Sequence, residues 1–193
     1  MAQRDDSTAL GATIGWLALL WLIFALEVVA SVAFKIQLAE WGGVRPHNWW
    51  GLTGIVGAHF LHADLGHLIA NTIGLGILGL VASSYSRSLT AVAVVTAGVF
   101  AGVFAWIFGS AGQVHIGASG IVFGLIGFLL FNGLFRKGCL ALVIAVAVLL
   151  LFGGALYGVL PSHDSDPPIS WQMHLGGFIG GALASWRTRK ERA

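Results

Sequence analysis

The sequence predicts an all-α membrane protein built as a bundle of six transmembrane helices. Hydrophobic residues make up 57% of the 193 residues, and charged residues make up only 9%. Soluble domains are about 45–50% apolar and about 25% charged, so this chain has too few charges to cover a surface in water. Its mean hydropathy of +0.87 is typical of a chain that faces lipid along most of its length. The 28 glycines suit helices that pack closely in a bilayer.

Six apolar segments define the expected helices, and each is near the roughly 20 residues that cross the hydrocarbon core of a bilayer. They are Thr13–Phe34, Asp64–Ser84, Leu89–Gly109, Ile116–Phe135, Leu140–Leu160 and Ser170–Trp186. The first is too long for the apolar core of a cleaved signal peptide, so we expect it to remain as a helix. The chain then divides into a polar N-terminal segment (residues 1–12), a six-helix membrane domain (residues 13–187) and a basic tail (residues 188–193).

The basic residues indicate how these helices are oriented in the membrane. Eight of the ten Lys and Arg residues lie in the N-terminal segment, the second and fourth connections and the tail, namely Arg4, Arg87, Arg136, Lys137, Arg187, Arg189, Lys190 and Arg192. Short loops rich in Lys and Arg stay in the cytoplasm. We therefore expect an integral, multi-pass protein of the plasma membrane with both termini cytoplasmic. The formal net charge of +2 gives no reason to expect nucleic acid as a partner.

Polar side chains inside apolar segments are costly in lipid and therefore indicate functional positions. His67, Ser119 and His174 each lie about one turn into a segment that enters the membrane from the outside. At a rise of about 1.5 Å per residue, all three would lie in one layer, roughly 5–8 Å below the outer boundary. Three separate helices would thus place polar groups at one depth. Glu27, in the first segment, is expected to pair with a polar group on a neighbouring helix.

Ser119 has the surroundings that a nucleophile needs. It lies between Gly117 and Gly120, and glycines permit close backbone approach and unusual dihedral angles. At the start of a helix, unpaired backbone N–H groups and the helix dipole suit a developing oxyanion. The alternative interpretation is that these glycines only pack helices together and that Ser119 bonds to its own backbone.

His174 is the candidate base for Ser119. It is followed by Gly177 and Gly181, which share one helix face and admit a close neighbour. If that neighbour is the fourth segment, the neutral imidazole reaches the Ser119 hydroxyl and activates it. No Asp or Glu lies at this depth in the second, fourth or sixth segment. The sequence therefore predicts a dyad and not a triad.

His67 and Asn71 are the candidate oxyanion donors. They are four residues apart, so they share a helix face, and both side chains carry N–H groups. Together with the backbone N–H of Ser119, they would supply the donors that a tetrahedral oxyanion needs. The alternative is that the two side chains make hydrogen bonds between helices.

Taken in order along the chain, these residues resemble the motifs of the rhomboid family of intramembrane serine proteases. Gly117-Ala-Ser-Gly120, followed by Phe123, resembles the Gly-x-Ser-Gly signature of that family. His67-x-x-x-Asn71 resembles its second-span motif, and His174-x-x-Gly177-x-x-x-Gly181 resembles its sixth-span motif. Each motif alone is weak, but the ordered set is specific.

The resemblance implies a fold, an activity and partners. The fold would be a rhomboid-like bundle of six helices, with a water-filled cavity open to the outside and a lateral gate at the fifth span. The activity would be cleavage of transmembrane segments by a Ser119–His174 dyad, with the Ser119 N–H, His67 and Asn71 as the oxyanion hole. The substrates would be single-pass or other transmembrane proteins within the lipid bilayer. Members of the family use no metal, so we expect neither a metal ion nor another cofactor.

Two features depart from the family pattern. Phe123 stands where the family often has Tyr, which keeps a ring to stack on the base but loses a hydroxyl. The family often has an adjacent Trp-Arg pair in the first connection, whereas Arg45 is separated from Trp41 and Trp49 here. We expect these tryptophans and Trp50 to be anchors at the membrane interface.

Three alternatives to a serine protease remain open. The first is a catalytically inactive rhomboid-like protein that binds or escorts membrane partners. The second is a zinc enzyme that uses His59, His62 and His67, although their spacings of 3 and 5 residues do not put all three on one helix face. The third is a small transporter, which is expected to have its polar site at the midplane of the membrane.

Overall fold

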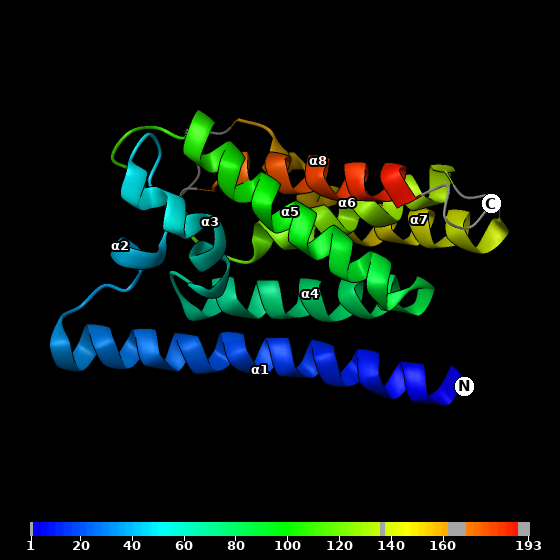
Figure 1. Cartoon of the computed structure of the whole chain (residues 1–193), viewed down its shortest axis with the longest axis horizontal. Helices are drawn as coiled ribbons and strands as arrows, with labels where there is room; N and C mark the ends of the chain where they lie inside the picture. The colour runs from blue at the N-terminus through cyan, green and yellow to red at the C-terminus, as the bar shows by residue number, and fades with distance from the viewer. Residues whose placement is uncertain (1, 136–137, 162–168, 189–193) are drawn as a thin grey trace.

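The computed structural model describes residues 2–135, 138–161 and 169–188. Within these residues, six long helices follow one another (Figure 1), and they are α1 (Ala2–Phe34), α4 (Leu65–Tyr85), α5 (Arg87–Phe108), α6 (Ser119–Phe135), α7 (Cys139–Phe152) and α8 (Trp171–Thr188). Short helices complete the first connection and the end of α7, namely α2 (Ala39–Gly42), η1 (Trp49–Thr53), α3 (Gly54–Gly57), η2 (Ala58–Phe60) and η3 (Gly153–Val159). The expected all-helical fold is confirmed for this part of the chain.

Four helical segments in the described part are long and apolar enough to cross a membrane. They are Leu10–Phe34, Leu65–Tyr85, Arg87–Phe108 and Cys139–Val159. Helix α6 is apolar but has only 17 residues, and the 18 residues of α8 include the polar side chains of Gln172, His174 and Arg187. The structure therefore supports four crossings directly, and the expected six depend on α6 and α8.

The helix boundaries differ from the predicted ones by more than two residues at three places. Helix α1 begins at Ala2 and not at Thr13, so the polar N-terminal segment continues the first helix. Helix α6 begins at Ser119 and not at Ile116, because Gly117 has a φ of +115°, which no α-helix accommodates. Helix α7 ends at Phe152 and not at Leu160, because the segment continues to Val159 as the 3-10 helix η3. The fourth connection (residues 136–137), most of the fifth (residues 162–168) and the tail (residues 189–193) lie outside the described residues.

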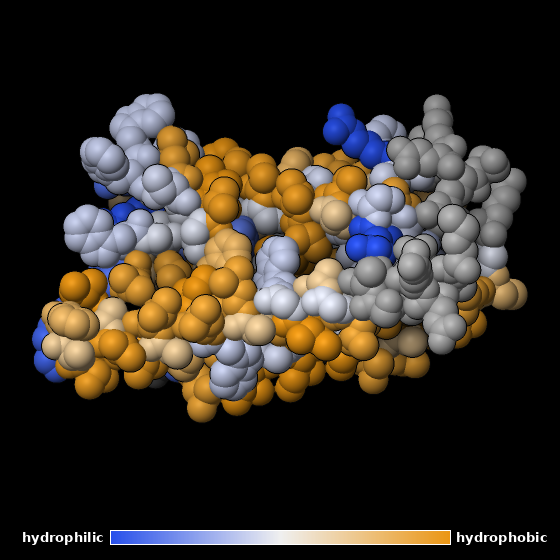
Figure 2. Space-filling view, turned by 60° about the horizontal axis from the view of Figure 1, so that its bottom comes forward, coloured by the Kyte–Doolittle hydropathy of each residue, from blue (hydrophilic) through white to orange (hydrophobic). Residues whose placement is uncertain are grey.

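Helix α6 is the centre of the molecule. It packs against α4, α5, α7 and α8, and 12 of its 17 residues are buried. Helix α1, in contrast, lies along α4 at one side of the molecule (Figure 1). The surface over α1 is mostly apolar (Figure 2). Exposed apolar surface of this extent is suited to lipid and not to water.

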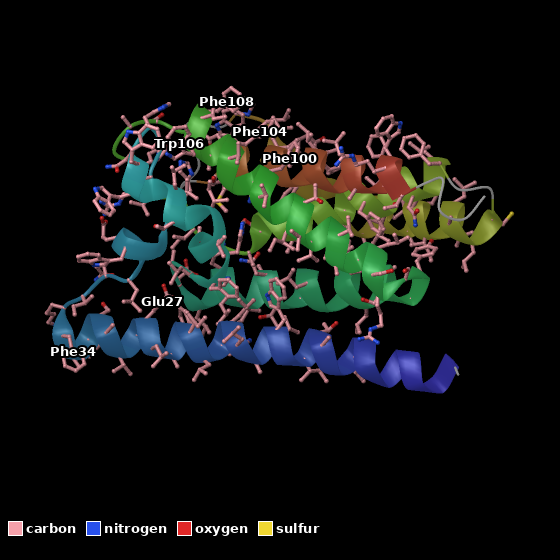
Figure 3. The ribbon with its side chains drawn as sticks, viewed as in Figure 1. Glu27, Phe34, Phe100, Phe104, Trp106 and Phe108 are labelled. Atoms are coloured by element: carbon pink, nitrogen blue, oxygen red, sulfur yellow. The ribbon has the colours of Figure 1, made fainter. Side chains whose placement is uncertain are left out.

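Helices α6 and α8 approach each other through glycines. A Cβ atom on Gly177 would overlap the carbonyl oxygen of Gly120, and a Cβ atom on Gly181 would overlap that of Gly124. Helix α5 packs on another face of α8, where a Cβ atom on Gly176 would lie 2.6 Å from the Cβ of Phe104. Phe104 lies beside Phe100 and Phe108 along α5 (Figure 3). The glycines on two faces of α8 therefore let it lie between α5 and α6.

The first connection packs on the end of the molecule opposite the start of α1 and the end of α8 (Figure 1). The indole N–H of Trp106 on α5 donates to the carbonyl of Asn48 at 2.9 Å, and Arg45 forms an ion pair with Glu40. Trp41, Trp49 and Trp50 are 79%, 78% and 83% exposed. Their exposure leaves these three indoles accessible, and their role as anchors at a membrane interface stays a prediction.

Candidate active site

The side chains of Ser119 and His174 form a direct hydrogen bond. The Ser119 Oγ and His174 Nε2 atoms are 2.8 Å apart. Ser119 is the first residue of α6, and His174 lies in the first turn of α8. Ser119 was expected about one turn inside its helix. It lies at the helix end because Gly117 prevents an earlier start. The glycine contacts between α6 and α8 bring the two helices close enough for the bond.

A backbone carbonyl orients the imidazole of His174. The Nδ1 atom lies 3.0 Å from the carbonyl oxygen of Gly158 in η3. A carbonyl oxygen can only accept a hydrogen bond, so Nδ1 carries the proton and Nε2 keeps its lone pair for the Ser119 hydroxyl. This is the tautomer that a general base needs. Sequence reasoning missed Gly158, because every residue has a backbone carbonyl and no motif distinguishes this one.

Phe123 covers one face of the imidazole. Its ring stacks on His174 with centroids 4.1 Å apart and an interplanar angle of 12°. Phe123 lies one helical turn after Ser119, and it is buried. A Cβ atom on Gly158 would lie 3.0 Å from His174 Nδ1 and 3.2 Å from Phe123. The ring of His174 is thus confined on one face by Phe123 and at its Nδ1 edge by the backbone of η3.

His67 and Asn71 lie against the backbone that leads into Ser119. A Cβ atom on Gly117 would lie 2.5 Å from the imidazole of His67 and 3.7 Å from Asn71 Nδ2. The amide nitrogen of Asn71 is buried, and no hydrogen-bond partner for it is found among the described residues. A buried donor without a protein partner is unusual, and it is available to a bound oxyanion. Gly117 itself is held by a 2.8 Å hydrogen bond from its N–H to the carbonyl of Ala58.

Two further histidines, His59 and His62, are buried near this site. His62 packs edge-on against His67, with ring centroids 5.1 Å apart. Burial, and secondarily the neighbouring His67, lower the pKa of His62 to about 4. Burial also lowers the pKa of His59, whose Nε2 lies 3.0 Å from the carbonyl of Gly98. Among the residues that the structure describes, no three His, Cys, Asp or Glu side chains come together to hold a metal ion.

Glu27 pairs with a polar group, as expected, but that group is a backbone N–H in the turn before α4 and not part of a helix. Its Oε2 accepts a 3.1 Å hydrogen bond from the N–H of His62. Figure 3 shows Glu27 on the face of α1 that is turned towards the rest of the molecule. The contact ties α1 to the turn just before α4, five residues before His67. Glu27 therefore supports the position of α4 and lies outside the site itself.

Long apolar helices packed around a polar site define a helical integral membrane protein. The chain belongs to the rhomboid family, since the family model for the Rhomboid domain matches residues 46–191. The match includes Ser119, His174, His67 and Asn71. The resemblance drawn from the motifs is thereby confirmed at the level of the family.

Individual relatives agree with this assignment. An uncharacterized protein of Mycobacterium tuberculosis (strain H37Rv) is 35% identical over 176 residues, which cover 89% of this chain and 71% of that protein. The "Putative rhomboid protease YdcA" of Bacillus subtilis is 27% identical over 179 residues, which cover 91% of this chain and 86% of the relative. The "RHOMBOID-like protein 1" of Arabidopsis thaliana is 29% identical over 144 residues, 72% of this chain and 34% of the relative.

Proposed function

We propose that this protein is an intramembrane serine endopeptidase that cleaves transmembrane segments of other membrane proteins. The observation that carries the proposal is the 2.8 Å hydrogen bond between Ser119 Oγ and His174 Nε2. The carbonyl of Gly158 supports the same role, because it selects the tautomer in which Nε2 accepts the serine proton. Membership of the rhomboid family agrees with this activity.

The proposed topology has six crossings, with both termini on the cytoplasmic side of the plasma membrane. Helices α6 and α8 are short for a crossing, but neighbouring helices bury much of α6 and of the glycine faces of α8. The start of α1 and the end of α8 lie at the same end of the molecule (Figure 1). An even number of crossings produces this arrangement. The Lys and Arg residues of the alternate loops favour the cytoplasm for that end.

The chemistry follows from these contacts. His174 Nε2 takes the proton of Ser119 as Oγ attacks the carbonyl carbon of the scissile peptide. The oxyanion accepts hydrogen bonds from the Ser119 N–H, His67 and Asn71, and one such donor is typically worth about 2.7–4 kcal/mol. His174 then gives its proton to the leaving amine. Water hydrolyses the acyl-enzyme by the same route, so these side chains and water complete the reaction without a cofactor.

The substrate must expose its backbone to Ser119. A helix shields its own carbonyl groups, so a cleavable transmembrane segment has to unwind locally. In their most apolar stretches, the Leu10–Phe34 and Cys139–Val159 segments have only 6% and 17% of their residues buried. Of these two weakly packed segments, the second contains η3, whose Gly158 carbonyl contacts His174, so we favour access for a substrate helix beside α7 and η3.

Cleavage in a bilayer tests the proposal. Wild-type protein reconstituted in liposomes with a single-pass model substrate should cut that substrate within or beside its transmembrane segment. Ser119→Ala should abolish cleavage, and His174→Ala should slow it by several orders of magnitude. Cleavage that persists at the wild-type rate in Ser119→Ala would contradict the proposal. Stable capture of the intact substrate by wild type, without any cleavage, would favour an inactive rhomboid-like escort protein.

A further inference from the structure

A second polar pair connects the same two segments as the candidate dyad. His115 Nδ1 lies 2.7 Å from Ser170 Oγ. His115 is four residues before Ser119, and Ser170 is four residues before His174. Two hydrogen bonds, Ser119–His174 and His115–Ser170, therefore join the start of α6 to the start of α8.

His115 is fixed firmly on the side of the nucleophile. Its backbone N–H and carbonyl both pair with Val44 of the first connection, each at 2.9 Å. Val44 has no exposed surface, and His115 is 6% exposed. The imidazole is also confined, since a Cβ atom on Gly109 would lie 2.6 Å from its Nε2. The side chain of His115 thus has little freedom to move away from Ser170.

Ser170 caps the first turn of α8 through two hydrogen bonds. Its hydroxyl accepts a hydrogen bond from the N–H of Met173 at 3.4 Å, and its carbonyl accepts one from the N–H of His174 at 3.1 Å. A serine that caps a helix in this way fixes the direction of the helix start. A shift of Ser170 therefore also moves the backbone of His174, which is hydrogen-bonded to it.

We infer that His115 and Ser170 are positioning residues, which hold His174 within hydrogen-bond distance of Ser119. The inference rests on the proposed protease function. Without the His115–Ser170 bond, the start of α8 loses a side-chain contact that links it to the loop before the nucleophile. A misplacement of about 1 Å in reacting groups can reduce a rate about 100-fold, so this second bond matters for the chemistry.

Single variants test each partner. Ser170→Ala and His115→Leu remove the bond, whereas Ser170→Thr keeps a hydroxyl and His115→Asn keeps a polar side-chain atom near the position of Nδ1. We expect the first two variants to lower kcat about 10- to 100-fold while KM stays within about twofold. Ser170→Thr and His115→Asn should recover much of that loss. A small fluorophosphonate probe should label Ser119 more slowly in the same two defective variants, because its reaction needs the base but no substrate helix.

A double-mutant cycle separates positioning from general structural damage. If the two residues act through their bond, Ser170→Ala with His115→Leu should be no slower than the slower single variant. Losses that multiply would overturn the inference, and so would wild-type kcat in both single variants. Apparent melting temperatures identify any variant that fails to fold. If His115→Leu is one of these, the same cycle is run with His115→Ala.

Two controls keep this inference distinct from the proposed function. Wild-type protein that neither cleaves nor reacts with the probe would mean that the protease function itself is wrong. The other outcome is that wild-type protein cleaves through Ser119 and that the Ser170→Ala and His115→Leu variants are fully active. This result would reject only the positioning role.

Discussion

At the scale of single residues, His174 is held on three sides by different groups. Ser119 lies at Nε2, the Gly158 carbonyl at Nδ1 and Phe123 against the ring face. In a Ser–His–Asp triad, a carboxylate occupies the place of Gly158 and also stabilises the imidazolium by its charge. A neutral carbonyl orients the ring but stabilises the charge less. Packing by Phe123 is therefore more important for keeping His174 in place than it would be in a triad with a carboxylate.

Gly117 offers a residue-scale prediction with a matched control. Its φ of +115° and the 2.5 Å approach of His67 leave no room for a Cβ atom, so Gly117→Ala should move either His67 or the backbone before Ser119. We expect cleavage to fall at least about 100-fold. Gly112 also has a positive φ, +86°, but a Cβ atom there would have nothing within 4 Å. Gly112→Ala shares the backbone strain of a positive φ but displaces no neighbour, so it should keep nearly full activity. Equal activity of the two variants would contradict this interpretation.

The side chains of the site were predictable from the sequence, whereas their backbone partners were not. Ser119, His174, His67 and Asn71 are polar groups in apolar segments, and the cost of burying them in lipid makes them stand out. The carbonyls of Gly158 and Ala58 and the link between His115 and Ser170 depend on contacts between distant segments. Such contacts have no local pattern.

At the scale of elements, the glycine contact between α6 and α8 decides whether the dyad forms. Cβ atoms on Gly177 and Gly181 would overlap backbone oxygens of α6, and backbone atoms cannot move aside as flexible side chains do. The spacing of these glycines predicted a close neighbour for α8, and that neighbour is α6. The start of α6 was predicted less well, because only the φ of Gly117 shows that the helix cannot begin earlier.

Substitution of Gly181 tests this contact. Gly181→Ala should push α8 away from α6, lower the apparent melting temperature in detergent and reduce cleavage, because both the packing and the Ser119–His174 distance change. Gly79→Ala is the control, since nothing lies within 4 Å of a Cβ atom at Gly79 in α4. It should leave stability and activity nearly unchanged. A Gly181→Ala protein as stable and active as the Gly79→Ala protein would refute the role of the glycine contact.

At the scale of the whole molecule, buried histidines in the connections make stability depend on pH. His59, His62 and His115 lie outside the long helices, and burial lowers the pKa of each from 6.5, to about 4 for His62. Between about pH 6.5 and these lower pKa values, the unfolded chain binds protons that the folded chain does not. Stability should therefore be full above about pH 6.5 and should fall as the pH falls towards 4.

Thermal unfolding in detergent at two pH values checks this expectation. The apparent melting temperature should be lower at about pH 5 than at about pH 7.5, and His62→Gln should make the difference smaller, because it removes one of the groups that titrate in this window. A melting temperature that is equal at both pH values, or higher at the acidic one, would show that these histidines do not have lowered pKa values.

The overall architecture was largely predictable, because lipid imposes apolar composition on every helix that it contacts. Composition alone predicted an all-helical membrane protein, and all six apolar segments correspond to long helices. The N-terminal segment was less predictable, since a polar sequence can extend an apolar helix, and α1 begins at Ala2. The packing of the first connection on the loop before Ser119 is a long-range arrangement that no local pattern indicates.

The central claim is that Ser119 is a nucleophile activated by His174, and covalent labelling tests it most directly. Wild-type protein in membranes or mild detergent is treated with a fluorophosphonate, and the modified residue is located by mass spectrometry of its peptides. The account predicts one adduct on Ser119, no adduct in Ser119→Ala and much slower labelling in His174→Ala, with all three proteins equally folded. Labelling of Ser119→Ala at the wild-type rate, or an adduct only at another residue, would contradict it.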